Sequence, residues 1–78
     1  MESYSLQSQR MFPLALEHLS YGSFEQHNPV VVQHEGAQFV VTRHSFAPYY
    51  TMTSDYWCGS REHELLTDVV WDIKRTMQ

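Results

Sequence analysis

The sequence predicts a small α+β fold in which two helices pack on one face of a three-stranded antiparallel sheet, in the order α-β-β-β-α. Three observations favour it. The chain has 78 residues, which is the size of one domain. Its middle is rich in β-branched residues around a glycine turn, and its last third has the hydrophobic period of a helix. We therefore expect residues 1–78 to form a single domain, with residues 1–10 as a flexible tail or an added helical turn.

The first element is a short helix predicted for residues 14–19. Pro13 suits the first turn of a helix, where its missing N–H would have no intrahelical partner in any case. Gly22 follows the segment closely and is suited to ending it. This helix would pack on the same face of the sheet as the C-terminal one.

The next two elements form a predicted β-hairpin of residues 30–34 and 37–42. Gly36, in the connecting Glu35-Gly36 pair, supplies the positive φ that a tight hairpin turn needs. A two-residue loop fixes the register, and its core-facing pairs are His34 with Ala37, Val32 with Phe39, and Val30 with Val41. The opposite face holds the pairs Gln33 with Gln38 and Val31 with Val40. A slip by one residue would exchange the two faces.

A third strand is predicted for residues 49–53, directly after Pro48. A C-terminal helix is predicted from about Arg61 to Gln78, with Ser60 as its N-cap and Gly59 permitting the turn before it. At the helical spacing of about 100° per residue, one arc of this helix is apolar. The arc contains Leu65, Leu66, Val69, Val70, Ile73 and Met77. A stripe of this kind must face a core.

The charge limits the classes of partner. The net charge is −4, from nine acidic and five basic residues, and the basic residues are scattered. Direct nucleic-acid binding usually requires a clustered basic surface, so we do not expect it. An acidic surface serves solubility, or it suits a basic partner such as a protein that handles nucleic acids.

Several features predict a cytoplasmic protein with no membrane partner. The first ten residues lack the apolar segment of a signal peptide. The apolar runs, such as Val30-Val31-Val32, are far too short to span a membrane. Cys58 is the only cysteine, so no intramolecular disulfide can form, which fits a reducing compartment.

Catalysis by a thiol would depend on Cys58, which lies five residues before His63. A helix beginning at Arg61 would favour the thiolate through its dipole. Glu62 or Glu64 would have to orient His63 as the base. The surrounding sequence matches no signature of a cysteine enzyme, so a partly buried, unreactive thiol is the preferred interpretation. We predict no catalytic residue.

Metal binding would depend on histidine, of which the chain has five residues. None forms a His-x-x-x-His motif. Extending the hairpin register backward places His27 opposite His44, and Glu25 or His18 could complete a zinc or nickel site. Hydrogen-bonded or solvated histidines are the simpler interpretation, so we predict no metal site. The three glycines are isolated, which provides no phosphate-binding loop and predicts no nucleotide cofactor.

The C-terminal segment offers a binding surface. Glu64, Asp68 and Asp72 follow one another at four-residue spacing and would form one acidic row on a helix. A convex helix face is a poor site for hydrolysis, which favours a concave one, but it can bind a partner. Trp71 falls outside the apolar stripe, near Arg75. It either anchors a partner or packs on another element of the domain.

Five aromatic residues lie close together before this helix: Phe46, Tyr49, Tyr50, Tyr56 and Trp57. Adjacent residues of a strand point to opposite faces, so Tyr49 and Tyr50 cannot both enter a core on one side of the sheet. We predict a recognition surface built from Tyr50, Tyr56 and Trp57, because tyrosine tolerates a boundary with water. Stacking on single-stranded nucleic acid would also need a positive groove, which the sequence does not indicate.

These patterns favour a small, acidic, non-enzymatic protein-binding module, an inhibitor or adaptor acting on a nucleic-acid-handling protein complex. Phage-encoded inhibitors of CRISPR effectors have comparable size and charge, an analogy that involves no sequence match. The predicted partner-binding residues are Tyr50, Tyr56, Trp57, Glu64, Asp68, Trp71, Asp72 and Arg75. The alternatives are a histidine-liganded metal-binding protein or thiol enzyme, and a homodimeric structural or regulatory subunit.

Overall fold

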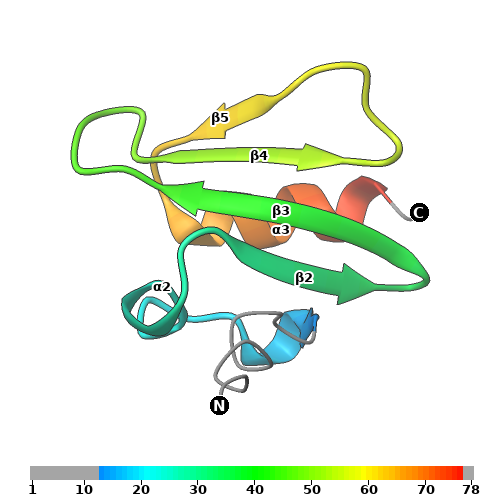
Figure 1. The fold of residues 1–78 in the computed structure, drawn as a ribbon. Helices are drawn as coiled ribbons and strands as arrows, with labels where there is room; N and C mark the ends of the chain where they lie inside the picture. Colours follow the sequence, from blue (N-terminus) through cyan, green and yellow to red (C-terminus); the bar gives the residue numbers. More distant parts are fainter. Residues whose placement is uncertain (1–12, 77–78) are drawn as a thin grey trace, which may run out of the picture.

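The computed structural model of the chain describes residues 13–76, and Figure 1 shows their arrangement. The elements are, in order, β1 (Leu14–Ala15), the 3-10 helix η1 (Leu16–His18), α2 (Ser23–Gln26), β2 (Val30–His34), β3 (Ala37–Arg43), β4 (Tyr50–Ser54), β5 (Arg61–His63) and α3 (Leu66–Thr76). The prediction of a small α+β fold with a C-terminal helix is confirmed.

The five strands form one sheet in the order β1-β2-β3-β4-β5, so neighbours in the chain are neighbours in the sheet. β1 runs parallel to β2, and the other pairs are antiparallel. The helix α3 lies across one face of the sheet, behind β3 in the view of Figure 1. The predicted three-stranded sheet is therefore the centre of a larger one, to which β1 and β5 each add a short edge strand.

The β2–β3 hairpin has the predicted register. Its Cα partners include Val30 with Val41, Val32 with Phe39, and His34 with Ala37. The loop consists of Glu35 (φ 53°) and Gly36 (φ 84°), two positive φ angles that match the twist of a tight hairpin. Val32, Phe39 and Val41 have no exposed surface, so the predicted core face is also confirmed.

The third predicted strand begins one residue late, at Tyr50. Tyr49 adopts a φ of 75°, a left-handed conformation that cannot continue a strand. Its N–H donates to the carbonyl of Phe46 at 2.9 Å, and its carbonyl accepts from the N–H of His44 at 2.6 Å. These bonds close the β3–β4 loop and bring Tyr50 onto the core side of β4.

The prediction of a helix from Arg61 to Gln78 is wrong in its first turn. Residues Arg61–His63 instead form β5 and pair with β4. The helix α3 begins at Leu66, so Ser60 is not its N-cap. The polar side chains of β5 favour this pairing because they reach a carboxylate of α3, a contact between distant elements that a helical wheel does not show.

Most of the predicted apolar stripe faces the core. Leu66, Val69 and Ile73 are buried, and Val70 packs against them while remaining partly exposed. Leu65 is 56% exposed because it precedes the helix. Met77 lies outside the described residues.

The predicted helix over residues 14–19 is only partly formed, as the 3-10 helix η1. Leu14–Ala15 pairs with β2 as a parallel strand, which leaves only η1 for a helical turn. A second short helix, α2, follows Gly22, where the first was expected to end. Pairing with the free edge of β2 overrides the weak helical preference of the segment. The tail predicted for residues 1–10 lies outside the described part of the chain.

The core lies between the sheet, α3 and α2. Phe24 of α2 contacts Tyr50 of β4, with ring centroids 5.6 Å apart. Within residues 13–76, the buried hydrophobic residues are Leu16, Phe24, Val30, Val32, Ala37, Phe39, Val41, Tyr50, Met52, Leu66, Val69 and Ile73. Among the described residues, no helix has the length and apolarity needed to cross a membrane.

Candidate functional site

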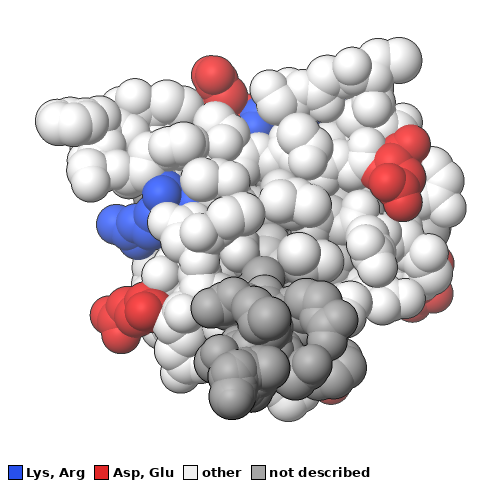
Figure 2. Space-filling view, viewed as in Figure 1, with Lys and Arg blue, Asp and Glu red and all other residues white. Residues whose placement is uncertain are grey.

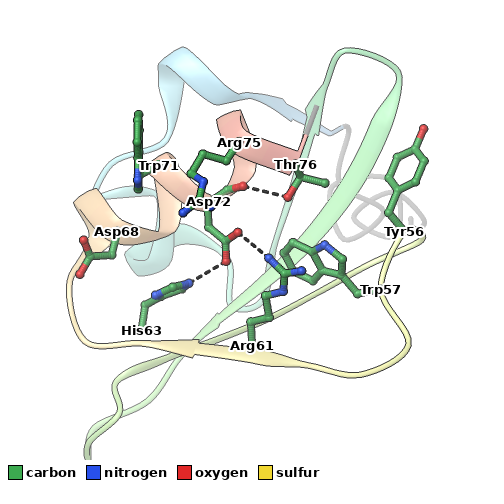
Figure 3. A pocket seen from close by; sticks show the side chains of 9 residues that line it. All are labelled: Tyr56, Trp57, Arg61, His63, Asp68, Trp71, Asp72, Arg75 and Thr76. Atoms are coloured by element: carbon green, nitrogen blue, oxygen red, sulfur yellow. Dashed lines mark hydrogen bonds and ion pairs between the residues drawn. The ribbon is translucent and has the colours of Figure 1, made fainter. Parts of the chain in front are cut away.

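A groove of about 560 Å³ lies between α3, β5 and the loop that joins β4 to β5 (Figure 3). We call it the aromatic groove. It is lined by Tyr56, Trp57, Arg61, His63, Asp68, Trp71, Asp72, Arg75 and Thr76. The lining combines three large aromatic side chains with charged groups of both signs. A concave site of this volume fits a small ligand or a few side chains of a partner protein.

Asp72 contacts two other residues that line the groove, Arg61 and His63. Its Oδ1 accepts a hydrogen bond from Nη1 of Arg61 at 2.7 Å, and its Oδ2 lies 2.8 Å from Nε2 of His63. An ionised carboxylate only accepts hydrogen bonds, so Nε2 of His63 is the donor. The Asp72 side chain is only 12% exposed, and both partners belong to β5. We call this cluster of Arg61, His63 and Asp72 the Asp72 clamp, because it ties β5 to α3.

Secondary structure positions each residue of the Asp72 clamp. Arg61 and His63 are two residues apart in β5, so both side chains point to the side of the sheet that carries α3. Ile73 of α3 is fully buried, and the neighbouring Asp72 is thereby carried to the flank of the helix that faces β5. Thr76 lies one turn later, and its Oγ1 donates to the carbonyl of Asp72 at 2.8 Å.

Trp57 joins the aromatic groove to the core. The guanidinium carbon of Arg61 lies 4.0 Å from the centroid of the Trp57 ring, a cation–π contact. Trp57 also meets the buried ring of Phe39 edge-on, with centroids 5.6 Å apart. The core on one side and Arg61 on the other therefore fix the indole in place.

Two aromatic side chains on the rim of the groove face water. Trp71 of α3 is 57% exposed, and Tyr56 of the β4–β5 loop is 62% exposed. Figure 3 shows them at opposite ends of the groove, with the Asp72 clamp between them. Rings of this size gain free energy when another molecule covers them, because water leaves their apolar surface.

The groove gathers six of the eight residues predicted to bind a partner: Tyr56, Trp57, Asp68, Trp71, Asp72 and Arg75. Glu64 is exposed between β5 and α3 and does not line it. Tyr50 is 2% exposed and belongs to the core, so it is not part of an exposed recognition surface. Its hydroxyl accepts a hydrogen bond from Nη1 of Arg43 at 3.0 Å, which satisfies this polar group inside the protein.

The predicted acidic row is not formed on one helix face. Glu64 precedes the start of α3, and Asp72 is turned toward β5, which leaves Asp68 as the exposed acid of the row within the helix. The lining residues that the sequence analysis missed are Arg61, His63 and Thr76. Arg61 and His63 were assigned to a helix, although their two-residue spacing is also the spacing of one face of a strand.

The cysteine and two of the histidines that were considered as catalytic or metal-binding groups lie outside the aromatic groove. Cys58 is a free, exposed thiol rather than a partly buried one, and it precedes a strand instead of a helix. It does not line the aromatic groove. Nε2 of His44 lies 2.9 Å from Oγ1 of Thr51, and His27 lies before the start of β2. Within residues 13–76, no three His, Cys, Asp or Glu side chains are grouped so that they could hold a metal ion.

Comparisons of the chain with models of protein families, with curated proteins and with solved structures give no match. The chemistry of the aromatic groove is therefore the basis for assigning a function. It offers indole and phenol rings for apolar contact and stacking. It also offers the guanidinium of Arg75 and the carboxylate of Asp68 for polar contact with a second molecule.

Replacing Asp72 with asparagine should lower the free energy of unfolding by about 1–2 kcal/mol, because Arg61 and His63 each lose a charge-assisted hydrogen bond. The Arg61 side chain is 48% exposed and can turn toward water, which keeps the loss below that of a fully buried ion pair. Urea unfolding followed by circular dichroism measures the change. Asp68→Asn, at an exposed position of the same helix, is the matched control and should change stability by less than about 0.5 kcal/mol. Equal losses in the two variants would contradict the Asp72 clamp.

Proposed function

We propose that this chain is a non-enzymatic protein-binding module whose aromatic groove receives a segment of a partner protein. The observation that supports this most is the pair of exposed rings, Trp71 and Tyr56, on either side of a preformed concave surface. Trp, Tyr and Arg are the residues that most often dominate binding energy at protein interfaces, and the groove is lined by all three types. Because Trp57 and the Asp72 clamp are already fixed, little conformational freedom is lost on binding.

The proposed partner is a nucleic-acid-handling protein with a basic surface, on which this chain acts as an inhibitor or adaptor. The net charge of −4 supports a basic partner. Asp68, which lines the groove, and Glu64, which follows His63 in the chain, are both exposed and available to such a surface. Asp72 is not, since its carboxylate is occupied by Arg61 and His63. The acidic contribution to binding therefore comes from Glu64 and Asp68.

One observation favours a second candidate function, an enzyme. The carboxylate of Asp72 fixes the proton on Nε2 of His63, as an aspartate does for the general base of many hydrolases. A hydrolase of this kind also needs a nucleophile or a bound water next to the histidine. The thiol of Cys58 does not line the groove, and the hydroxyl of Thr76 donates to the carbonyl of Asp72. Binding is therefore the better supported function.

Capture of partners from a cell lysate tests the proposal, provided that matched variants are compared. The wild type and Phe46→Ala, which changes a ring 82% exposed outside the groove, should recover the same protein. The double variant Tyr56→Ala/Trp71→Ala should lose it. The double variant Glu64→Lys/Asp68→Lys should weaken capture in a salt-dependent way if the partner surface is basic. Equal recovery by all four proteins would overturn the assignment of the groove.

A further inference from the structure

The sheet has a second face, opposite α3, that no described element covers. The register of the strands assigns to this outer face the residues Ala15, Val31, Gln33, Gln38, Val40, Thr42, Thr51, Thr53 and Glu62. The residues that alternate with them along the same strands, such as Val32, Phe39 and Met52, point the other way into the core. None of the nine outer side chains is buried. The face is therefore a broad, exposed surface of the described chain.

The outer face is almost without charge. The chain has nine Asp and Glu and five Lys and Arg residues, yet among the nine outer-face residues of the described sheet only Glu62, on the edge strand β5, is charged. Figure 2 views the molecule from this side and shows the visible charged atoms toward the margins. The charged residues of the inner side, such as Arg43 and Arg61, sit at strand ends or on the edge strand. Depletion of charge is the compositional mark of the central part of a protein interface.

We infer that the outer face binds the outer face of a second copy of this chain, forming a two-fold symmetric dimer. Two copies that each carry a charge of −4 repel one another least when they meet through a surface that keeps their like charges apart. The outer face meets this condition. A basic partner, by contrast, would find only Glu62 to pair with there.

The side chains on the outer face are also self-complementary. The cross-strand pair Gln33 and Gln38 offers amide donors and acceptors at once, so the same patch can hydrogen-bond to itself across a two-fold axis. Val31 and Val40 form a directly paired apolar patch beside these amides. In a two-fold symmetric interface the same patch meets itself, so it suits amides that can both donate and accept and an apolar patch that can pack on its own copy.

The size of the outer face indicates a small interface. Strands lie about 4.8 Å apart and rise about 3.3 Å per residue, so the face measures roughly 20 by 20 Å, or about 400 Å² per copy. A standard interface buries about 800 Å² per partner. The dimer should therefore be weak and form mainly at high protein concentration. Because Arg61 and His63 point to the α3 side, both aromatic grooves remain open in it, so the dimer does not depend on the function of the groove.

Sedimentation of the full chain over about 5 to 500 μM tests the dimer. Val40 is the position to change, since it lies in the middle of β3, the central strand of the sheet. The wild type should shift from monomer toward dimer mass as concentration rises. Val40→Lys and Val40→Glu should each stay monomeric, because like charges would meet across the two-fold axis. An equal mixture of the two variants should associate again, because the charges then have opposite sign.

Two controls keep the test decisive. Thr67→Lys adds the same charge at an exposed position of α3, away from the outer face, and should associate like the wild type. Gln38→Lys changes an exposed outer-face position and should prevent association even if the Val40 variants fold poorly. A wild type that stays monomeric up to the highest concentration would overturn the inference. So would lysine variants of the outer face that associate as well as Thr67→Lys.

Discussion

Replacing Phe39 with alanine is expected to lower the free energy of unfolding by about 3–5 kcal/mol, the largest loss expected of any substitution discussed for this chain. The ring of Phe39 has no exposed surface and lies in β3, the central strand, against the indole of Trp57. Removing a buried ring of this size costs about 3–5 kcal/mol, from lost apolar contact and from the cavity that remains. A domain of 78 residues has a total stability of only about 4–12 kcal/mol. The substitution therefore removes a large part of the stability, and urea unfolding followed by circular dichroism measures how much remains.

The matched control for this prediction is Phe46→Ala, the same substitution in the β3–β4 loop. Phe46 is 82% exposed, so its removal should change the free energy of unfolding by less than about 0.5 kcal/mol. Because both variants remove the same side chain, the difference between their free energies of unfolding reports the effect of burial alone. Similar stabilities for the two proteins would contradict the core described above.

The hairpin and the core face could be predicted because the information for them is local. A Glu35-Gly36 turn between two segments rich in β-branched residues fixes the length of the loop, and the loop fixes every pair of β2 and β3. The apolar residues of α3 were found for a similar reason, since their spacing is set within a few turns of one helix. Each of these features is specified by residues close together in the chain.

The two edge strands could not be predicted in this way. Leu14–Ala15 forms a strand only because the free edge of β2 accepts it, and β2 lies more than a dozen residues further along the chain. Arg61–His63 follows a Gly-Ser pair that suits the start of a helix. Its identity as β5 depends on pairing with β4 and on the carboxylate of Asp72. Contacts between distant segments decide both strands.

Contacts between distant segments also explain which residues of the candidate site were missed, since Arg61 and His63 line the groove only because β5 pairs with β4. Tyr56 was predicted to belong to a recognition surface and Trp71 to lie outside the apolar stripe, and both rings are exposed. The role of Asp72 was misjudged because its two partners belong to a strand that the sequence analysis treated as helix. Asp68 and Asp72 of the predicted acidic row do line the groove, but the pairing of β5 with β4 turns Asp72 toward Arg61 and His63.

Replacing Trp71 with alanine is expected to weaken binding to the partner by at least about 30-fold, which corresponds to about 2 kcal/mol. Trp71 is the largest exposed ring of the groove, at 57% exposure, so much of its surface remains to be covered on binding. Its exposure also means that the fold should lose less than about 1 kcal/mol of stability. Titration calorimetry with the captured partner measures the affinity, and thermal unfolding measures the stability of each variant.

Trp71→Phe and Leu65→Ala distinguish a binding role of Trp71 from a general effect of apolar surface. Phenylalanine keeps an aromatic ring in the groove and should restore part of the affinity, because much of the apolar surface is covered again. Leu65 is 56% exposed next to the start of α3 but does not line the groove, so its removal should leave the affinity unchanged. If Trp71→Ala bound as tightly as Leu65→Ala, the ring would have to be assigned to the stability of α3. The partner surface would then have to lie outside the aromatic groove.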